Sequence, residues 1–105
     1  MIHFKTTTLF DKQAKKLGKK YRNLKNDLSS FIEDFEKLHA SATSIQKNLY
    51  KVRIANSNKN RGKSAGYRVY YYIQLEETTY LLTIYDKSDI EMIDEELLKD
   101  LIEEL

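Results

Sequence analysis

The sequence predicts a single α+β domain in the order β-α-α-β-β-β-α, with the helices packed on one face of a small, mostly antiparallel sheet. Three observations predict this class. Apolar residues recur at helical spacing over residues 8–38, alternate with polar residues over residues 49–85, and return to helical spacing over residues 90–105. With 105 residues and no linker or repeat, residues 1–105 are expected to form one domain with one modest core.

The first part of the chain is predicted to hold one short strand and two amphipathic helices. Apolar and polar residues alternate over residues 2–6, which favours a strand. Thr8 can cap a first helix whose apolar face holds Phe10, Ala14 and Leu17. The apolar stripe of the second helix, over residues 23–38, consists of Leu24, Leu28, Phe31, Ile32, Phe35 and Leu38.

A meander of three strands is predicted to follow the helices. The segment 39–46 is polar and small, which indicates a loop. Side chains then alternate over residues 49–54, 67–75 and 80–85, with a turn at Glu76-Glu77.

The chain is predicted to end in an acidic helix. Ser88 and Glu91 have the spacing of a capping box at its start. Its apolar stripe is expected to be Ile90, Ile93, Leu97, Leu101 and Leu105.

Alternation divides the side chains of the meander between two faces. The residues expected to pack on the helices are Tyr50, Val52, Ile54, Tyr67, Val69, Tyr71, Ile73, Tyr80, Leu82 and Ile84. The residues expected on an open face are Lys51, Arg53, Arg68, Tyr70, Tyr72, Tyr85 and Lys87. Cations mixed with aromatic rings can bind phosphates and stack bases. A solvated polar face with cross-strand tyrosine packing is the alternative.

Charge is distributed unevenly along the chain, although its net value is only +2. Residues 1–69 carry 16 Lys and Arg against 5 Asp and Glu, whereas residues 70–105 carry 2 against 11. The interval 47–68 holds seven basic residues and no acidic one. Such a block suits a polyanion, above all nucleic acid. The alternative is a solvated surface that the acidic end of the chain balances.

Composition argues against several classes of protein. The chain has no cysteine, so neither disulfides nor a thiolate metal site is expected. No apolar run approaches the length of a membrane span, and the first residues do not read as a signal peptide, so a cytoplasmic location is expected. His3 and His39 lie far apart in sequence, so neither a metal site nor a two-histidine ribonuclease site is favoured. No cofactor is expected.

The tripeptide Gly62-Lys63-Ser64 is similar to the end of a nucleotide-binding P-loop, but its context is wrong. Ser57 stands where that motif needs glycine, and a strand follows where a helix is needed. Residues 56–66 are therefore interpreted as a polar hairpin loop in which Gly62 and Gly66 allow the turn. The basic side chains of this loop are Lys59, Arg61 and Lys63.

The segments YKVRI, GKSAGYRVYYYI and LLTIYDKSD, in this order after two lysine-rich helices, resemble the RelE/ParE superfamily of bacterial toxins. Within it they are most similar to the RelE-like HigB group. The resemblance covers nearly the whole chain, and residues 62–73 are its most specific part. It implies a small toxin encoded beside an antitoxin. Members of RelE type cleave mRNA in the ribosomal A site, whereas members of ParE type poison DNA gyrase.

The resemblance also implies functional residues. The catalytic candidates are Arg68, Lys87, Lys51 and Arg53. The RNA-binding candidates come instead from the basic loop and the open face of the sheet, and they are Lys59, Arg61, Lys63, Tyr70, Tyr72 and Tyr85. Some members use a tyrosine near the position of Ile93, so the general acid and base stay unassigned here. The implied partners are an antitoxin, the ribosome and mRNA. A gyrase poison, or a module that only binds an antitoxin, is the alternative on the same fold.

Overall fold

The computed structural model describes residues 3–59, 65–74, 77–89 and 93–105. Predictions made for Ile2, Leu75, Glu76, Ile90 and Glu91 fall outside these residues. The elements are β1 (His3–Thr6), α1 (Thr8–Lys20), α2 (Leu24–Glu33), α3 (Phe35–Ala40), β2 (Thr43–Gln46), β3 (Leu49–Ile54), β4 (Tyr67–Gln74), β5 (Thr78–Asp86) and α4 (Glu95–Glu103).

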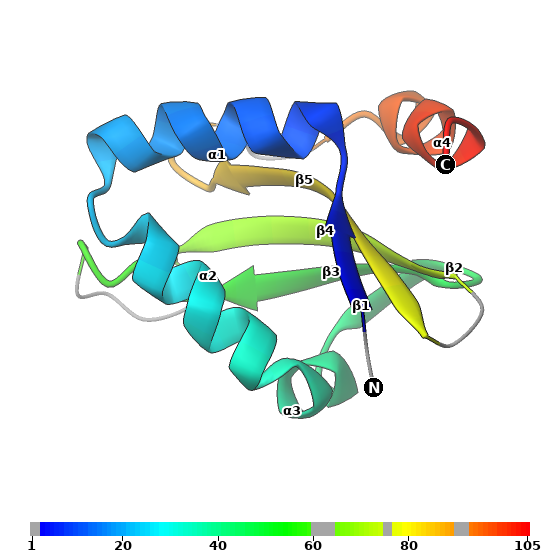
Figure 1. Cartoon of the computed structure of the whole chain (residues 1–105), viewed down its shortest axis with the longest axis horizontal. Coiled ribbons are helices and arrows are strands. Elements are labelled where there is room, and N and C mark those ends of the chain that lie inside the picture. Colours follow the sequence, from blue (N-terminus) through cyan, green and yellow to red (C-terminus); the bar gives the residue numbers. More distant parts are fainter. Residues whose placement is uncertain (1–2, 60–64, 75–76, 90–92) are drawn as a thin grey trace.

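Within the described part of the chain, five strands form one sheet in the order β1-β5-β4-β3-β2. β1 runs parallel to β5, and the other neighbouring strands are antiparallel. Figure 1 shows the sheet crossing the middle of the molecule, with α1 at the top of the view and α2 and α3 at the lower left. The predicted α+β class with a mostly antiparallel sheet is confirmed, but an additional helix and strand are present.

The predicted helix over residues 23–38 is two helices that meet at Asp34. The backbone of Asp34 has φ −98° and ψ 17°. Its N–H donates to the carbonyl of Ser30 at 3.0 Å, and its own carbonyl accepts from Leu38 at 2.9 Å. Backbone hydrogen bonds therefore continue through the junction, while α3 turns away from the direction of α2 (Figure 1).

β2 lies in the segment that was predicted to be a loop. A two-residue turn, Lys47-Asn48, joins it to β3, and Gln46 pairs with Leu49 across that turn. Asn48 has φ 66°, a left-handed conformation that asparagine adopts more readily than most residues. An asparagine between two alternating segments is a hairpin signal, and it identifies this strand in retrospect.

One face of the sheet packs on α1, α2 and α3. Phe10 and Leu17 of α1 and Phe31 of α2 contribute to this cluster and are buried. As predicted, the sheet contributes Val52, Ile54, Tyr67, Val69, Tyr71 and Ile84 to it, with Tyr50 and Ile73 partly buried at its margin.

A β-bulge in β5 changes which side chains face these helices. Tyr70 pairs with Thr83 but Tyr71 pairs with Leu81, so Leu82 is an extra residue without a partner in the register. As a result Leu81, not Leu82, joins the cluster under α1 to α3. The prediction that Tyr80 and Leu82 face these helices is wrong, because one inserted residue reverses the alternation.

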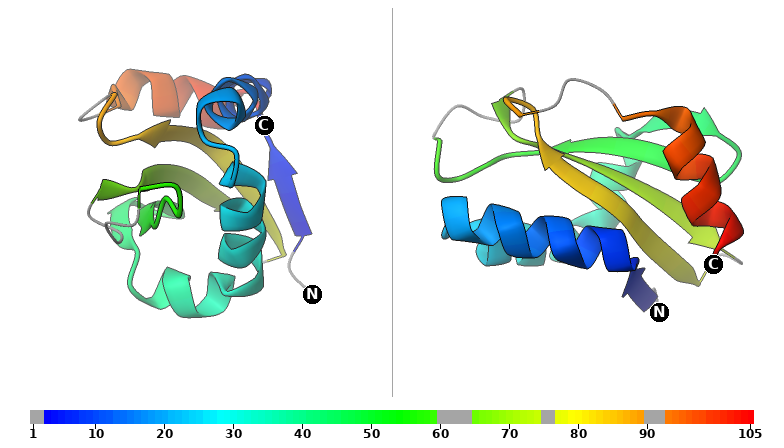
Figure 2. Two further views of the ribbon diagram at one scale, coloured as in Figure 1. Left: turned by 90° about the vertical axis from the view of Figure 1, so that its left-hand side faces the viewer. Right: turned by 90° about the horizontal axis from the view of Figure 1, so that it is seen from above.

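The opposite face of the sheet is covered by α4, so the prediction that all helices pack on one face is wrong. Leu98 and Leu101 of α4 form a second cluster with Ile93 and with sheet residues. The two views in Figure 2 show α4 on the side of the sheet away from α2. The sheet contributes Leu49, Tyr70, Leu82 and Tyr85, which would otherwise expose a large apolar area to water.

The start and the buried stripe of α4 also differ from prediction. Its N-cap is Asp94, whose carboxylate accepts from the backbone N–H of Glu96 at 3.0 Å, and not Ser88. Leu98 is buried, whereas Leu97 and Leu105 are exposed. None of the described helices combines the length and apolarity needed to cross a lipid bilayer.

Candidate nucleic-acid interface

The register of β3 and β4 gathers three cations on the α4 side of the sheet. Arg53 lies directly opposite Arg68, and Lys51 lies opposite Tyr70. Directly opposed residues of an antiparallel pair project from the same face. We call Lys51, Arg53 and Arg68 the basic patch.

Arg68 is the buried member of the basic patch and has 6% of its surface exposed. Its Nη1 donates to the backbone carbonyls of Tyr67 at 3.3 Å and Gly66 at 3.5 Å. Burial lowers the pKa of Arg68, and the charge of Arg53 lowers it further. An arginine stays charged under such a shift, so the patch retains its positive charge.

The other two cations line a small depression at the β2 edge of the sheet. Its volume is about 260 Å³, and its lining includes the side chains of Lys51 and Arg53 together with the hydroxyl residues Ser41 and Thr43. Arg53 is exposed, and Lys51 is half-buried with its Nζ 5.9 Å from the ring centre of Tyr70. Cationic groups beside hydroxyl donors suit an anion such as a phosphate group.

Tyr70 and Tyr85 do not lie on an open surface. Only 3% of Tyr70 and 4% of Tyr85 is exposed, because both rings pack in the cluster under α4. The rings lie nearly parallel, with their centres 6.3 Å apart. Burial, followed by the nearby Tyr85, raises the pKa of Tyr70 to about 12. The prediction that these two tyrosines lie on an open face is wrong, and Tyr72 is half-buried beside them. Their stacking on bases stays a prediction.

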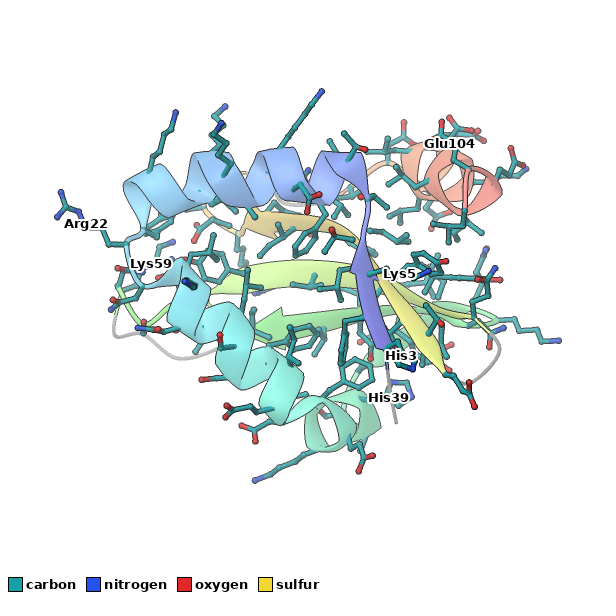
Figure 3. All side chains as sticks on the ribbon, viewed as in Figure 1. His3, Lys5, Arg22, His39, Lys59 and Glu104 are labelled. Atoms are coloured by element: carbon teal, nitrogen blue, oxygen red, sulfur yellow. The ribbon has the colours of Figure 1, made fainter. Side chains whose placement is uncertain are left out.

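Lys59 was predicted to bind RNA, but it is held by the fully buried carboxylate of Asp86. Its Nζ lies 2.6 Å from Oδ1 of Asp86 and also donates to the carbonyl of Ala65 at 3.3 Å. The side chain of Asn56 donates to the same carboxylate at 3.1 Å. In Figure 3, Arg22 extends away from the molecule while Lys59 lies against it. Lys59 therefore ties the loop after β3 to the end of β5.

Asp86 is the last residue of β5 and the centre of this network. Burial by itself would raise the pKa of Asp86, yet hydrogen bonds from Lys59, Ser88 and Asn56 outweigh burial and hold the pKa below its ordinary value. Ser88 donates to it through both its backbone N–H, at 2.9 Å, and its hydroxyl. Sequence reasoning missed this network. The sequence pattern that could have predicted it is a pair of polar residues, Asn56 and Asp86, which lie at the ends of predicted strands beside a cationic loop.

Gly66 fits where no other residue would, because two backbones cross there. A Cβ on Gly66 would lie 2.0 Å from the carbonyl oxygen of Ile54 and 2.9 Å from the nitrogen of Asn56. The requirement at Gly66 is close approach of two backbone segments rather than loop flexibility.

The carbonyl of Gly66 also accepts from the N–H of Lys87 at 3.1 Å, which sets Lys87 at the same end of the sheet as Arg68. Lys87 is exposed. Gly62, Arg61 and Lys63 fall outside the described residues.

The histidines lie away from the basic patch. Nδ1 of His39 is 2.7 Å from the hydroxyl of Tyr71, and its ring stacks on Phe35 at 5.6 Å on the face covered by α1 to α3. His3 is exposed on β1 at one edge of the sheet. In the described ranges, no three His, Cys, Asp or Glu side chains are grouped closely enough to hold a metal ion.

Comparison with known proteins leaves the family open. A scan of the sequence against protein-family models finds no match, and a search of curated proteins finds no significant relative.

Proposed function

We propose that this protein is the toxin of a type II toxin–antitoxin system, a RelE-like endoribonuclease that cleaves mRNA on translating ribosomes in the cytoplasm. The resemblance of three sequence segments suggests the family. The alternation of side chains along β3 and β4 brings the cations Lys51, Arg53 and Arg68 to one face of the sheet. These cations are the groups that could bind the RNA phosphate.

The observation that carries the proposal is the direct pairing of Arg53 with Arg68. Like charges in opposite positions of an antiparallel pair destabilise the sheet. A bound phosphate removes this repulsion and replaces it with charge-assisted hydrogen bonds. The register therefore places two guanidinium groups side by side, an arrangement that favours binding an RNA backbone.

The proposed reaction needs no metal ion. The 2′-hydroxyl oxygen of one nucleotide attacks the adjacent phosphorus, the bond from phosphorus to the 5′-oxygen breaks, and a 2′,3′-cyclic phosphate forms. Arg53, which is exposed, would hold the phosphate oxygens, which gain negative charge in the transition state, and the buried Arg68 would add positive charge beside it. One such contact contributes on the order of 3 kcal/mol, by analogy with an oxyanion donor.

Two proton transfers accompany this step. A base removes the proton of the 2′-hydroxyl, and an acid supplies one to the leaving 5′-oxygen. Lys51 of the basic patch and Lys87 at the end of β5 are the candidates for these roles. The ribosome would hold the mRNA in position, so that orientation supplies much of the remaining acceleration.

Cleavage of mRNA on programmed ribosomes tests the proposal. Arg53 is exposed, so Arg53→Ala should leave the fold intact and reduce the cleavage rate by about 100-fold. Lys12→Ala is the matched control, because Lys12 is an exposed cation on α1. Equal rates for the Arg53 variant and the wild type would refute the proposed mechanism.

Inducing the protein in cells separates the two alternatives on this fold. Induced cells with damaged DNA and intact mRNA would identify a gyrase poison. Normal growth, together with tight binding of the neighbouring gene product, would identify a module that only binds an antitoxin.

A further inference from the structure

A second depression, larger than the one in the basic patch, lies beside β1. Its volume is about 590 Å³, and its lining includes Phe4 of β1, Phe35 of α3 and Ile32 of α2. Phe4 and Phe35 meet edge to face, with their ring centres 5.1 Å apart. Ile32 is 41% exposed. The depression therefore offers apolar surface to an occupant.

Carboxylates surround this apolar surface. Glu33, Asp34 and Glu36 line the depression, and Lys37 is the one cation in its lining. Four of the five acidic residues in the first 69 positions lie within residues 27–36. In an otherwise basic half of the chain, this concentration makes the depression complementary to a cationic ligand.

The outer edge of β1 supplies backbone hydrogen-bonding groups to the same place. The N–H groups of His3 and Thr7 donate to the carbonyls of Glu77 and Leu81, toward β5. Because N–H groups alternate in direction along a strand, those of Phe4 and Thr6 point away from β5. β1 is the outermost strand of the sheet on this side. An extended peptide can add to such an edge.

We propose that β1 and the adjacent depression bind an extended segment of a partner protein, added as a strand to the sheet. The segment would carry a large apolar side chain, which contacts Ile32 and Phe4, flanked by Lys or Arg residues that pair with Glu33 and Glu36. This interaction is independent of RNA cleavage, because the basic patch lies next to the opposite edge strand.

A second copy of this chain fits the surface less well. Pairing two β1 edges about a two-fold axis would bring the same carboxylates of both copies together. Their repulsion would oppose such a dimer, whereas a basic segment from another protein would be attracted. Charge therefore favours a partner of different sequence.

Three synthetic peptides provide the test. The first is a nine-residue peptide that alternates lysine with valine and has phenylalanine at its centre. The second replaces each lysine with glutamate, and the third replaces two alternate valines with proline to remove backbone N–H groups. Titration is followed by amide hydrogen exchange of the full chain.

The expected result is specific to individual amides. The lysine peptide should protect the amides of Phe4 and Thr6, leave that of His3 unchanged, and bind about tenfold more tightly than the glutamate peptide. The proline peptide should lose this protection. Equal binding by the lysine and proline peptides, or protection of other strands only, would overturn strand addition.

Charge reversal tests the surface itself. The double variant Glu33→Lys, Glu36→Lys should weaken binding of the lysine peptide about tenfold. The control is Glu103→Lys with Glu104→Lys, two exposed glutamates at the end of α4, which should bind as the wild type does. Unchanged binding by the first variant would overturn the proposal. So would a concentration-dependent dimer of the wild type that protects the same amides.

Discussion

The depressions beside the two edges of the sheet carry opposite charge. At the β2 edge, Lys51 and Arg53 line a depression of about 260 Å³. At the β1 edge, Glu33, Asp34 and Glu36 line one of about 590 Å³. A net charge of +2 conceals this separation. The difference teaches that a small sheet can present two surfaces suited to ligands of opposite sign, one for each edge strand.

The two edges also differ in what their charges do to the fold. At the β2 side, cross-strand pairing places Arg53 against Arg68, and burial, followed by the charge of Arg53, lowers the pKa of Arg68. At the β1 side, the acids lie at the junction of α2 and α3, where packing of Phe35 on Phe4 holds the junction against the sheet. The following variants test this comparison, beginning with the largest expected effect.

Gly66→Ala should have the largest effect, because it disrupts the strand ends that build the basic edge. The added Cβ would lie 2.0 Å from the backbone oxygen of Ile54, which cannot move without shifting β3. We expect the free energy of unfolding to fall by about 3 kcal/mol in urea titrations.

Gly18→Ala is the matched control for this variant. Its Cβ would meet Leu24 at 4.0 Å, which is ordinary contact, and Gly18 lies within a helix. We expect this variant to be more stable than the wild type by about 1 kcal/mol. Similar losses in both variants would show that the close approach at Gly66 is unimportant.

Asp86→Asn should have the next largest effect, because it removes the charge that anchors the loop beside the basic patch. At pH 7 we expect a loss of about 2 kcal/mol, below the range for a fully buried pair because Lys59 is partly exposed. Hydrogen bonds hold the pKa of Asp86 below its ordinary value. Its contribution is therefore present above the unfolded pKa of about 3.9 and is lost as the pH falls through the lower folded pKa.

Urea titrations at several pH values measure this effect. The difference between wild type and Asp86→Asn should be largest near pH 7 and should shrink below about pH 4. Asp89→Asn is the control, because its pair with Lys20, at 3.4 Å, is largely exposed. A difference that does not depend on pH would contradict the assignment to the charge of Asp86.

Arg53→Glu should separate stability from function at the basic edge. It converts the like-charged pair with Arg68 into an opposite pair, so the free energy of unfolding should rise by about 0.5 kcal/mol. Cleavage of ribosome-bound mRNA should be lost at the same time. Lys47→Glu, an exposed change in the turn before β3, should leave stability unchanged. If Arg53→Glu is less stable than the wild type, repulsion between Arg53 and Arg68 does not destabilise the fold.

Ile32→Ser should have the smallest effect and concerns the acidic edge. Because Ile32 is 41% exposed, we expect the free energy of unfolding to change by less than about 0.5 kcal/mol. Binding of the lysine–valine peptide should nevertheless weaken. A decrease in the free energy of unfolding above about 1 kcal/mol would show that Ile32 packs in the core and is not available to a partner.

Periodicity in the sequence identified most of the sheet and the placement of the basic patch. The alternation over residues 49–54 and the start of β4 correctly set Arg53 and Arg68 on one face, because the β3–β4 pair has no bulge. The same reasoning failed in β5, where Leu82 is inserted and the alternation reverses. A bulge depends on how two distant segments fit together, so local periodicity does not reveal it.

The acidic C-terminal helix shows a second limit of prediction from sequence. Helical spacing identified α4, but spacing does not tell which sheet face a helix covers. The apolar side chains of Leu49, Leu82 and Tyr85 decide this, because they need cover on the face that α1 to α3 leave bare. Tyr70 and Tyr85, predicted to meet RNA, are thereby buried.

By itself, the sequence determined the α+β class, most element positions, and the basic and acidic character of its two halves, since these depend on neighbours along the chain. The tertiary structure alone decided which residues those charges oppose. It paired Arg53 with Arg68, joined Lys59 to the buried Asp86, and set the carboxylates of the α2–α3 junction beside β1. Pairing register, burial and the approach of distant segments are properties of the packed chain, because each depends on residues far apart in sequence.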